Sequence, residues 1–149
     1  MPIVIILMAI IFNSLNAILV GYHFVLYGQQ YNLHWLVSPY FLAGLSLYVA
    51  GFIITKKSDK LLRDLRHADQ SGYKIPYGFL YEYVSCPNYM GEIIQWAGWA
   101  LLTLSPAGLV FLTWTIANLV PRALAYHGWY RETFPDYPEE RKAIIPGLL

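Results

Sequence analysis

The feature that most constrains this chain is a set of long stretches without charged side chains. The first, over residues 3–27, contains no Lys, Arg, Asp or Glu. At about 1.5 Å per residue a helix of that length crosses a hydrocarbon core of about 30 Å. A second stretch covers residues 36–55, and a third runs from Ile93 to Val120. With 57% hydrophobic and 13% charged residues, the composition is typical of a membrane protein.

The third stretch is too long for one comfortable span, and Ser105 and Pro106 break it. It therefore predicts a helical hairpin. The second span opens with Ser38 and Pro39, which suit the N-cap and first-turn positions of a helix. The sequence thus predicts an all-α polytopic membrane bundle of about four spans. These spans cover residues 3–27, 36–55, 87–104 and 106–126.

The basic residues test this topology, because cytoplasmic loops of membrane proteins carry an excess of Lys and Arg. All ten fall in two segments. They are Lys56, Lys57, Lys60, Arg63, Arg66 and Lys74 between spans two and three, and Arg122, Arg131, Arg141 and Lys142 towards the C-terminus. Four spans put both segments and both termini on the cytoplasmic side, whereas a single kinked third helix would separate the segments. We therefore expect a cytoplasmic loop over 56–86 and a cytoplasmic tail over 127–149.

Polar residues at helical spacing mark the cytoplasmic ends of three spans. Asp59 and Arg63 are four residues apart and Arg66 lies three further on, so a helix that continues from span two presents them on one face. A solvated basic collar with an intrahelical ion pair explains this spacing as well as a ligand site does.

Asn88 and Glu92 are one helical turn apart, with Trp96 a further turn along. A lipid-facing carboxylate would cost on the order of 2–3 kcal/mol. We therefore expect Glu92 to face the bundle interior or a polar cavity. Such a residue marks either a functional site or a structural hydrogen bond between helices.

Arg122, Tyr126 and Tyr130 recur every four residues on the last helix. An aromatic belt at the membrane interface with a snorkelling Arg is the alternative to a ligand site. Together the three clusters would surround one cytoplasmic mouth suited to an anionic, hydrogen-bonding ligand such as a phosphorylated nucleotide. No GxGxxG or Walker pattern occurs, so a bound dinucleotide would not use a Rossmann domain.

Two long segments resemble the C-terminal half of the steroid 5α-reductase family. They are GYKIPYGFLYEYVSCPNYMGEIIQWAGWAL and NLVPRALAYHGWYRETFPDYPEERKAIIPGLL; the earlier run LAGLSLYVAGFIITKKSDKLLRDLR is similar to the family's preceding helix and basic loop. The resemblance implies an integral membrane enzyme that uses NADPH to reduce the C4–C5 double bond of a 3-oxo-steroid or a similar enone lipid. It also implies the endoplasmic reticulum of a eukaryote or the inner membrane of a bacterium, and no metal or nucleic-acid partner.

The resemblance further implies cofactor contacts at seven positions. They are Asp59, Arg66, Lys74, Asn88, Glu92, Arg122 and Tyr130. Asn88 and Glu92 match the pair that holds the nicotinamide end, and Trp96 would contact the substrate. Thr55 departs from the family's usual Asn, and Tyr126 replaces the first His of a frequent His-His pair.

Length is the larger departure. Family members have about seven spans, and this chain begins near their fourth helix. The glutamate and tyrosine that would hold the steroid 3-oxo group belong to the preceding helices, so the resemblance gives no catalytic residue here. We expect a fragment or half of a split protein, one that associates with itself or with the missing part, or else an inactive chain. One alternative is an isoprenylcysteine-type methyltransferase that uses S-adenosylmethionine, although Val84, Ser85 and Cys86 stand here in place of that family's usual Arg-His pair. The other alternative is a non-catalytic membrane fragment.

Overall fold

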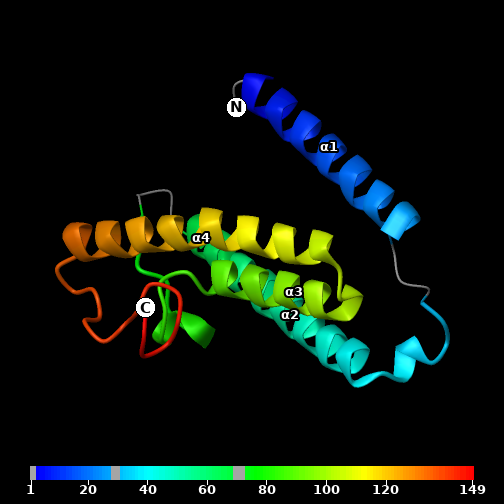
Figure 1. Cartoon of the computed structure of the whole chain (residues 1–149). Helices are drawn as coiled ribbons and strands as arrows, with labels where there is room; N and C mark the ends of the chain where they lie inside the picture. Colours follow the sequence, from blue (N-terminus) through cyan, green and yellow to red (C-terminus); the bar gives the residue numbers. More distant parts are fainter. Residues whose placement is uncertain (1–2, 28–30, 69–72) are drawn as a thin grey trace. The chain divides into compact units, whose positions relative to one another are not determined.

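The structure, a computed structural model, describes residues 3–27, 31–68 and 73–149. All secondary-structure elements within these ranges are helices. Its elements in chain order are α1 (Ile3–Tyr27), the 3₁₀ helix η1 (Trp35–Val37), α2 (Pro39–Ala68), the 3₁₀ helix η2 (Phe79–Glu82), α3 (Pro87–Thr103) and α4 (Pro106–Thr133) (Figure 1). Within these ranges the only β pairing is an isolated bridge between Val84 and Lys142. The predicted all-α class is confirmed.

The chain divides into two compact units, one ending at Val37 and the other starting at Ser38. Helix α1 belongs to the first unit, and its hydrophobic side chains are exposed along its length, from Ile3 to Leu26. A helix with apolar side chains all round needs an apolar solvent. Helices α1, α2 and α4 are long and apolar enough to cross a membrane, which makes this an integral membrane protein. With 17 residues, α3 is shorter, and its predicted crossing stays a prediction.

Helices α2 and α4 both begin where a Ser precedes a Pro. The Ser38 Oγ accepts a hydrogen bond from Phe41 N at 3.1 Å, and the Ser105 Oγ accepts one from Gly108 N at 3.0 Å. Such N-caps satisfy backbone donors that a helix leaves unpaired in its first turn. Helix α2 thus begins at the Ser-Pro pair, whereas residues 36 and 37 of the predicted span belong to η1.

Two helices continue beyond the predicted spans. Helix α2 runs on to Ala68 because residues 56–68 contain neither Gly nor Pro. Helix α4 continues past Tyr126 to Thr133. It ends there because Pro135 disfavours helical backbone at the residue before it, Phe134. The extra turns carry polar residues of the site beyond the predicted apolar spans.

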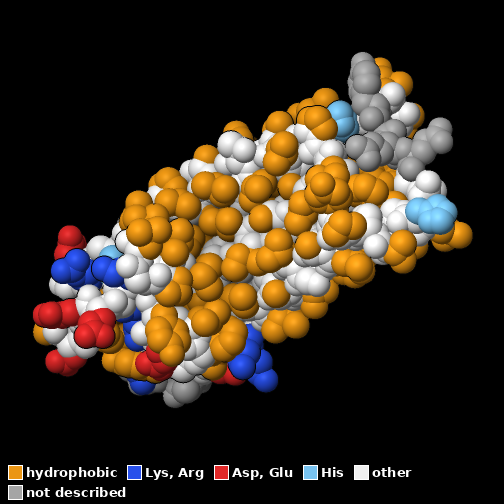
Figure 2. All heavy atoms as spheres, turned by 60° about the horizontal axis from the view of Figure 1, so that its bottom comes forward, with side chains coloured by type: hydrophobic (Ala, Val, Ile, Leu, Met, Phe, Trp, Pro, Cys, Tyr) orange, Lys and Arg blue, Asp and Glu red, His pale blue; other side chains and the backbone are white. Residues whose placement is uncertain are grey.

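Helices α2, α3 and α4 form the bundle of the second unit. A tight turn at Leu104 and Ser105 joins α3 to α4, so the C-terminal ends of α2 and α4 lie beside the N-terminus of α3 (Figure 1). Both basic segments thus meet at one end of the bundle, as the four-span topology requires. Figure 2 shows one face of the molecule. On it the charged side chains gather largely at one end, and hydrophobic side chains cover most of the rest. That this end is cytoplasmic stays a prediction.

Glycines seven residues apart bring α2 and α3 into backbone contact. Gly51 faces Gly91, and Gly44 faces Gly98 in the antiparallel pair. A Cβ on Gly51 would lie 2.5 Å from the Gly91 carbonyl oxygen, and one on Gly98 would lie 2.7 Å from that of Gly44. Small residues permit this close approach of membrane helices. The packing fixes the register of α3 on α2.

The tail after α4 folds back onto the start of α3. The backbone N–H of Ser85 donates to Lys142 O at 2.8 Å, and that of Cys86 donates to Ala143 O at 3.1 Å. Cys86, Ala143 and Ile144 are buried with Ala123 of α4 in a small core. The tail therefore links the N-terminus of α3 to α4.

Candidate functional site

A polar cluster lies between the end of α2 and the first turns of α3. The side-chain Nδ2 of Asn88 donates to the Asp59 carboxylate at 3.3 Å. The Thr55 hydroxyl donates to the backbone carbonyl of Asn88, also at 3.3 Å. Glu92, half-buried one turn further along α3, is near enough to Asp59 for the two charges to interact. The structure thus brings together Asp59, Asn88 and Glu92, three of the predicted residues. The Thr55 hydroxyl is therefore already hydrogen-bonded to α3.

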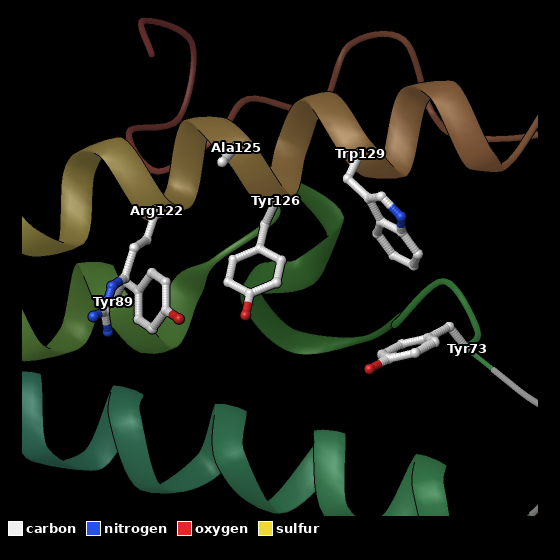
Figure 3. Close-up of a pocket in the computed structure, with 6 residues that line it drawn as sticks. All are labelled: Tyr73, Tyr89, Arg122, Ala125, Tyr126 and Trp129. Atoms are coloured by element: carbon white, nitrogen blue, oxygen red, sulfur yellow. The ribbon is translucent and has the colours of Figure 1, made fainter. Parts of the chain in front are cut away.

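A pocket of about 530 Å³ lies on the other side of the α3 N-terminus, against α4. Its lining consists of Tyr73, Tyr89, Arg122, Ala125, Tyr126 and Trp129. Figure 3 shows Arg122, Tyr126 and Trp129 projecting from α4 towards the same space as the Tyr89 and Tyr73 rings. The volume is within the roughly 300–1,000 Å³ usual for ligand pockets. Four aromatic rings and one guanidinium suit a ligand that is both planar and anionic.

Helical geometry decides which side chains of α4 enter this pocket. Successive residues turn by about 100°, so a side chain seven positions on returns to within about 20° of the first, whereas one eight positions on is about 80° away. Trp129 therefore shares the face of Arg122, and Tyr130 does not. The Tyr130 ring instead stacks on Tyr137 of the tail, with centroids 5.4 Å apart and planes at 14°. The cofactor contact predicted for Tyr130 stays a prediction.

The segment that carries Tyr73 is held by a buried arginine of the tail. Arg141, 2% exposed, donates from Nη1 to Pro76 O at 3.1 Å and lies 5.2 Å from the Tyr77 ring centroid and 5.0 Å from that of Tyr137. Its Nε and Nη2 have no hydrogen-bond partner within the part of the chain described. The two aromatic faces stabilise the guanidinium charge. The tail thereby fixes one wall of the pocket.

Trp96 and Lys74 are not among the described residues that line the pocket. Trp96 packs on Phe111 of α4, with ring centroids 4.3 Å apart, and so faces the apolar part of the bundle. Lys74 is exposed next to Tyr73. The backbone of Arg66 belongs to the last turn of α2, but its side chain lies outside the described residues. The roles predicted for these three residues stay predictions.

Cys86 occupies the N-cap position of α3 without making a side-chain cap. Burial raises the pKa of its thiol from 9.0 to about 12. The thiol is therefore protonated at neutral pH and is a poor nucleophile. We therefore assign Cys86 to packing in the small core with Ala123, Ala143 and Ile144.

Sequence reasoning missed Ala125 and three aromatic residues of the pocket, Tyr73, Tyr89 and Trp129. Tyr89 follows Asn88 directly, and a turn of about 100° aims it at α4 while Asn88 faces α2. Trp129 was recoverable from its spacing of seven from Arg122. Tyr73 had no local signal, because its ring partner Trp129, with centroids 5.2 Å apart, is distant in the sequence.

Comparison with known proteins decides which family this arrangement represents. The family model described as 3-oxo-5-alpha-steroid 4-dehydrogenase matches residues 1–149. The chain belongs to this family. The assignment supports the predicted reductase resemblance over the methyltransferase alternative.

Curated relatives agree with the family match. The rat 3-oxo-5-alpha-steroid 4-dehydrogenase 1 is 47% identical over 77% of this chain and 44% of its own length. The Steroid 5-alpha-reductase DET2 of Gossypium hirsutum is 46% identical over 97% of this chain and 57% of its own length. The human 3-oxo-5-alpha-steroid 4-dehydrogenase 1 is 41% identical over the whole chain and 57% of its own length. The chain thus spans about half the length of these relatives.

Proposed function

We propose that this chain forms the NADPH-binding part of a membrane reductase. The substrate would be a 3-oxo-steroid or similar enone lipid, reduced at its C4–C5 double bond in the endoplasmic reticulum or a bacterial inner membrane. The observation that carries the proposal is the pocket of about 530 Å³ that holds Arg122 among aromatic rings. Next to it, on the same turn of α3, the Asn88 amide meets the Asp59 carboxylate.

The chemistry of these donors and acceptors fits a nicotinamide dinucleotide. The guanidinium of Arg122 provides directed donors for a phosphate, and the rings of Tyr89, Tyr126 and Trp129 provide faces for planar groups. Amide and carboxylate groups such as those of Asn88 and Glu92 pair with a carboxamide, which presents both donors and an acceptor.

Each group has a distinct part in the proposed reaction. NADPH, when bound, would supply the hydride for the β-carbon of the enone, and the proton for the α-carbon would come from water. Asn88 and Glu92 would fix the orientation of the nicotinamide so that one face is presented to the lipid. Arg122, with Lys74 and Arg66 at the basic end, would neutralise phosphate charge. The apolar helices supply a membrane environment for a hydrophobic substrate.

The test compares Glu92→Gln with Glu139→Gln in detergent-solubilised protein. Glu139 is exposed on the tail and lies outside the pocket lining. We expect Glu92→Gln to raise the dissociation constant of NADPH about tenfold, the scale of one hydrogen bond to a charged group. Glu139→Gln should leave it within twofold of the wild-type value. Quenching of NADPH fluorescence on binding provides the measurement.

Two outcomes would contradict the proposal. Equal dissociation constants for the two variants would exclude the nicotinamide role of Glu92. Wild-type protein that binds S-adenosylmethionine but not NADPH would exclude the reductase function.

A further inference from the structure

One buried oxygen joins three separate parts of the second unit. Ser85, 4% exposed, precedes α3, and its Oγ lies 2.7 Å from His127 Nδ1 on α4. The same Oγ lies 2.5 Å from the Tyr137 hydroxyl and 3.1 Å from the Lys142 carbonyl oxygen, both on the tail. The start of α3, the last turns of α4 and the tail therefore meet at a single hydroxyl, which we call the Ser85 junction.

The donors and acceptors of the Ser85 junction define one proton arrangement. A serine hydroxyl has one proton and two lone pairs. The Lys142 carbonyl only accepts, so it takes the Ser85 proton. The two lone pairs then accept from the Tyr137 hydroxyl and from His127, which must carry its proton on Nδ1. In this arrangement every hydrogen-bonding position of the Ser85 hydroxyl is used.

The Ser85 junction adjoins both the polar cluster and the pocket along the chain. Ser85 is three residues before Asn88, and His127 follows Tyr126 directly. The Tyr137 ring also stacks on Tyr130. A shift of the junction would therefore move the first turn of α3 relative to the pocket face of α4.

We propose that Ser85 is a positioning residue for the nucleotide site, through its hydrogen bond to His127 and its two bonds to the tail. The inference rests on the proposed function. By holding α3 against α4, Ser85 fixes the separation between Asn88 and Arg122, which would hold opposite parts of one nucleotide. Ser85 itself is not in the pocket lining.

The bundle provides a matched control at its other end. There the Thr103 and Ser105 hydroxyls, both buried, lie 3.0 Å apart at the turn between α3 and α4. Thr103→Val keeps the shape of the side chain and removes a buried hydroxyl that connects the same two helices. Unlike Ser85→Ala it removes no hydrogen bond to the tail, and it lies at the opposite end of the bundle from the proposed nucleotide site.

The experiment measures NADPH affinity, thermal unfolding and the His127 tautomer in the full chain. We expect Ser85→Ala to raise the NADPH dissociation constant at least tenfold and Thr103→Val to change it less than twofold. Both substitutions should lower the midpoint of thermal unfolding by a similar amount. ¹⁵N spectra of histidine-labelled protein, assigned with His127→Gln, should show His127 protonated on Nδ1 in the wild type and in Thr103→Val. Ser85→Ala should lose that signal.

Each outcome decides the question. Similar NADPH affinities for Ser85→Ala and Thr103→Val, or a wild-type His127 protonated on Nε2 alone, would overturn the inference and leave the proposed function intact. Wild-type protein that does not bind NADPH would overturn both. If Ser85→Ala does not fold, Tyr137→Phe replaces it, with an expected threefold loss of affinity and a retained Nδ1 proton; an unchanged affinity would overturn the inference.

Discussion

Helix α3 packs against α2 through glycines and against α4 through aromatic rings. On the α2 side, Gly91 and Gly98 bring the two backbones together, with Cβ positions that would overlap backbone atoms of the partner. On the α4 side, Gly108 comes close to Ala100 next to the turn, and further along rings lie between the helices, with Tyr89 on Tyr126 and Trp96 on Phe111. Only this second interface, among those described, leaves a pocket of about 530 Å³.

The two sides of α3 therefore differ in what they do physically. Backbone contact leaves no room for a ligand but gives α2 and α3 a fixed register. The α4 interface, by contrast, contains a pocket lined by rings and Arg122. In the proposed function the close pair α2 and α3 would hold Asn88 and Glu92 in place, and the side of α3 that faces α4 would accommodate the rest of the nucleotide.

The largest expected effect comes from filling the tight interface. Gly98→Ala places a methyl group 2.7 Å from the Gly44 carbonyl oxygen, and a backbone atom cannot move aside as a side chain does. We expect a loss of about 3 kcal/mol in the free energy of unfolding, at the upper end of overpacking effects. Circular dichroism during thermal unfolding in detergent measures it.

Gly128→Ala is the matched control on α4. A Cβ at Gly128 would meet nothing within 4 Å, so the change should stabilise the helix by about 0.5–1 kcal/mol through helix propensity. The two substitutions are chemically identical and should act in opposite directions. Gly98→Ala protein as stable as the wild type would refute the tight interface.

A smaller effect is expected from the open interface. Arg122→Ala removes the guanidinium from the pocket and should raise the dissociation constant of NADPH about tenfold or more, the loss of one charge-assisted hydrogen bond. Stability should change little because Arg122 is exposed. Arg131→Ala, in the last turn of α4 and outside the pocket lining, should alter affinity less than twofold. Titration of NADPH fluorescence measures the affinity of both variants. Equal losses of affinity in Arg122→Ala and Arg131→Ala would mean that general basic charge, not the pocket, binds the nucleotide.

Much of this fold could be predicted from the sequence because the bilayer imposes simple rules on length, charge and helix starts. The hairpin at Ser105 and the polar face of Asn88 and Glu92 follow from such local patterns. The pairing of Gly44 with Gly98 does not, because a spacing of seven does not say which helix is the partner. Tyr73 was likewise unpredictable, since residues distant in sequence, Arg141 among them, hold its segment in place.

The smallest expected effect concerns the hydrogen bond between Asn88 of α3 and Asp59 of α2. If the bond only joins α2 to α3, a double-mutant cycle with Asn88→Ala and Asp59→Ala should show a coupling of about 1 kcal/mol in the free energy of unfolding. The same cycle measured on NADPH affinity should then show none. We expect coupling in both, because the bond also holds the Asn88 amide for the nicotinamide. Coupling confined to unfolding would assign the pair to the contact between α2 and α3 alone, and the nucleotide site would then begin at Tyr89.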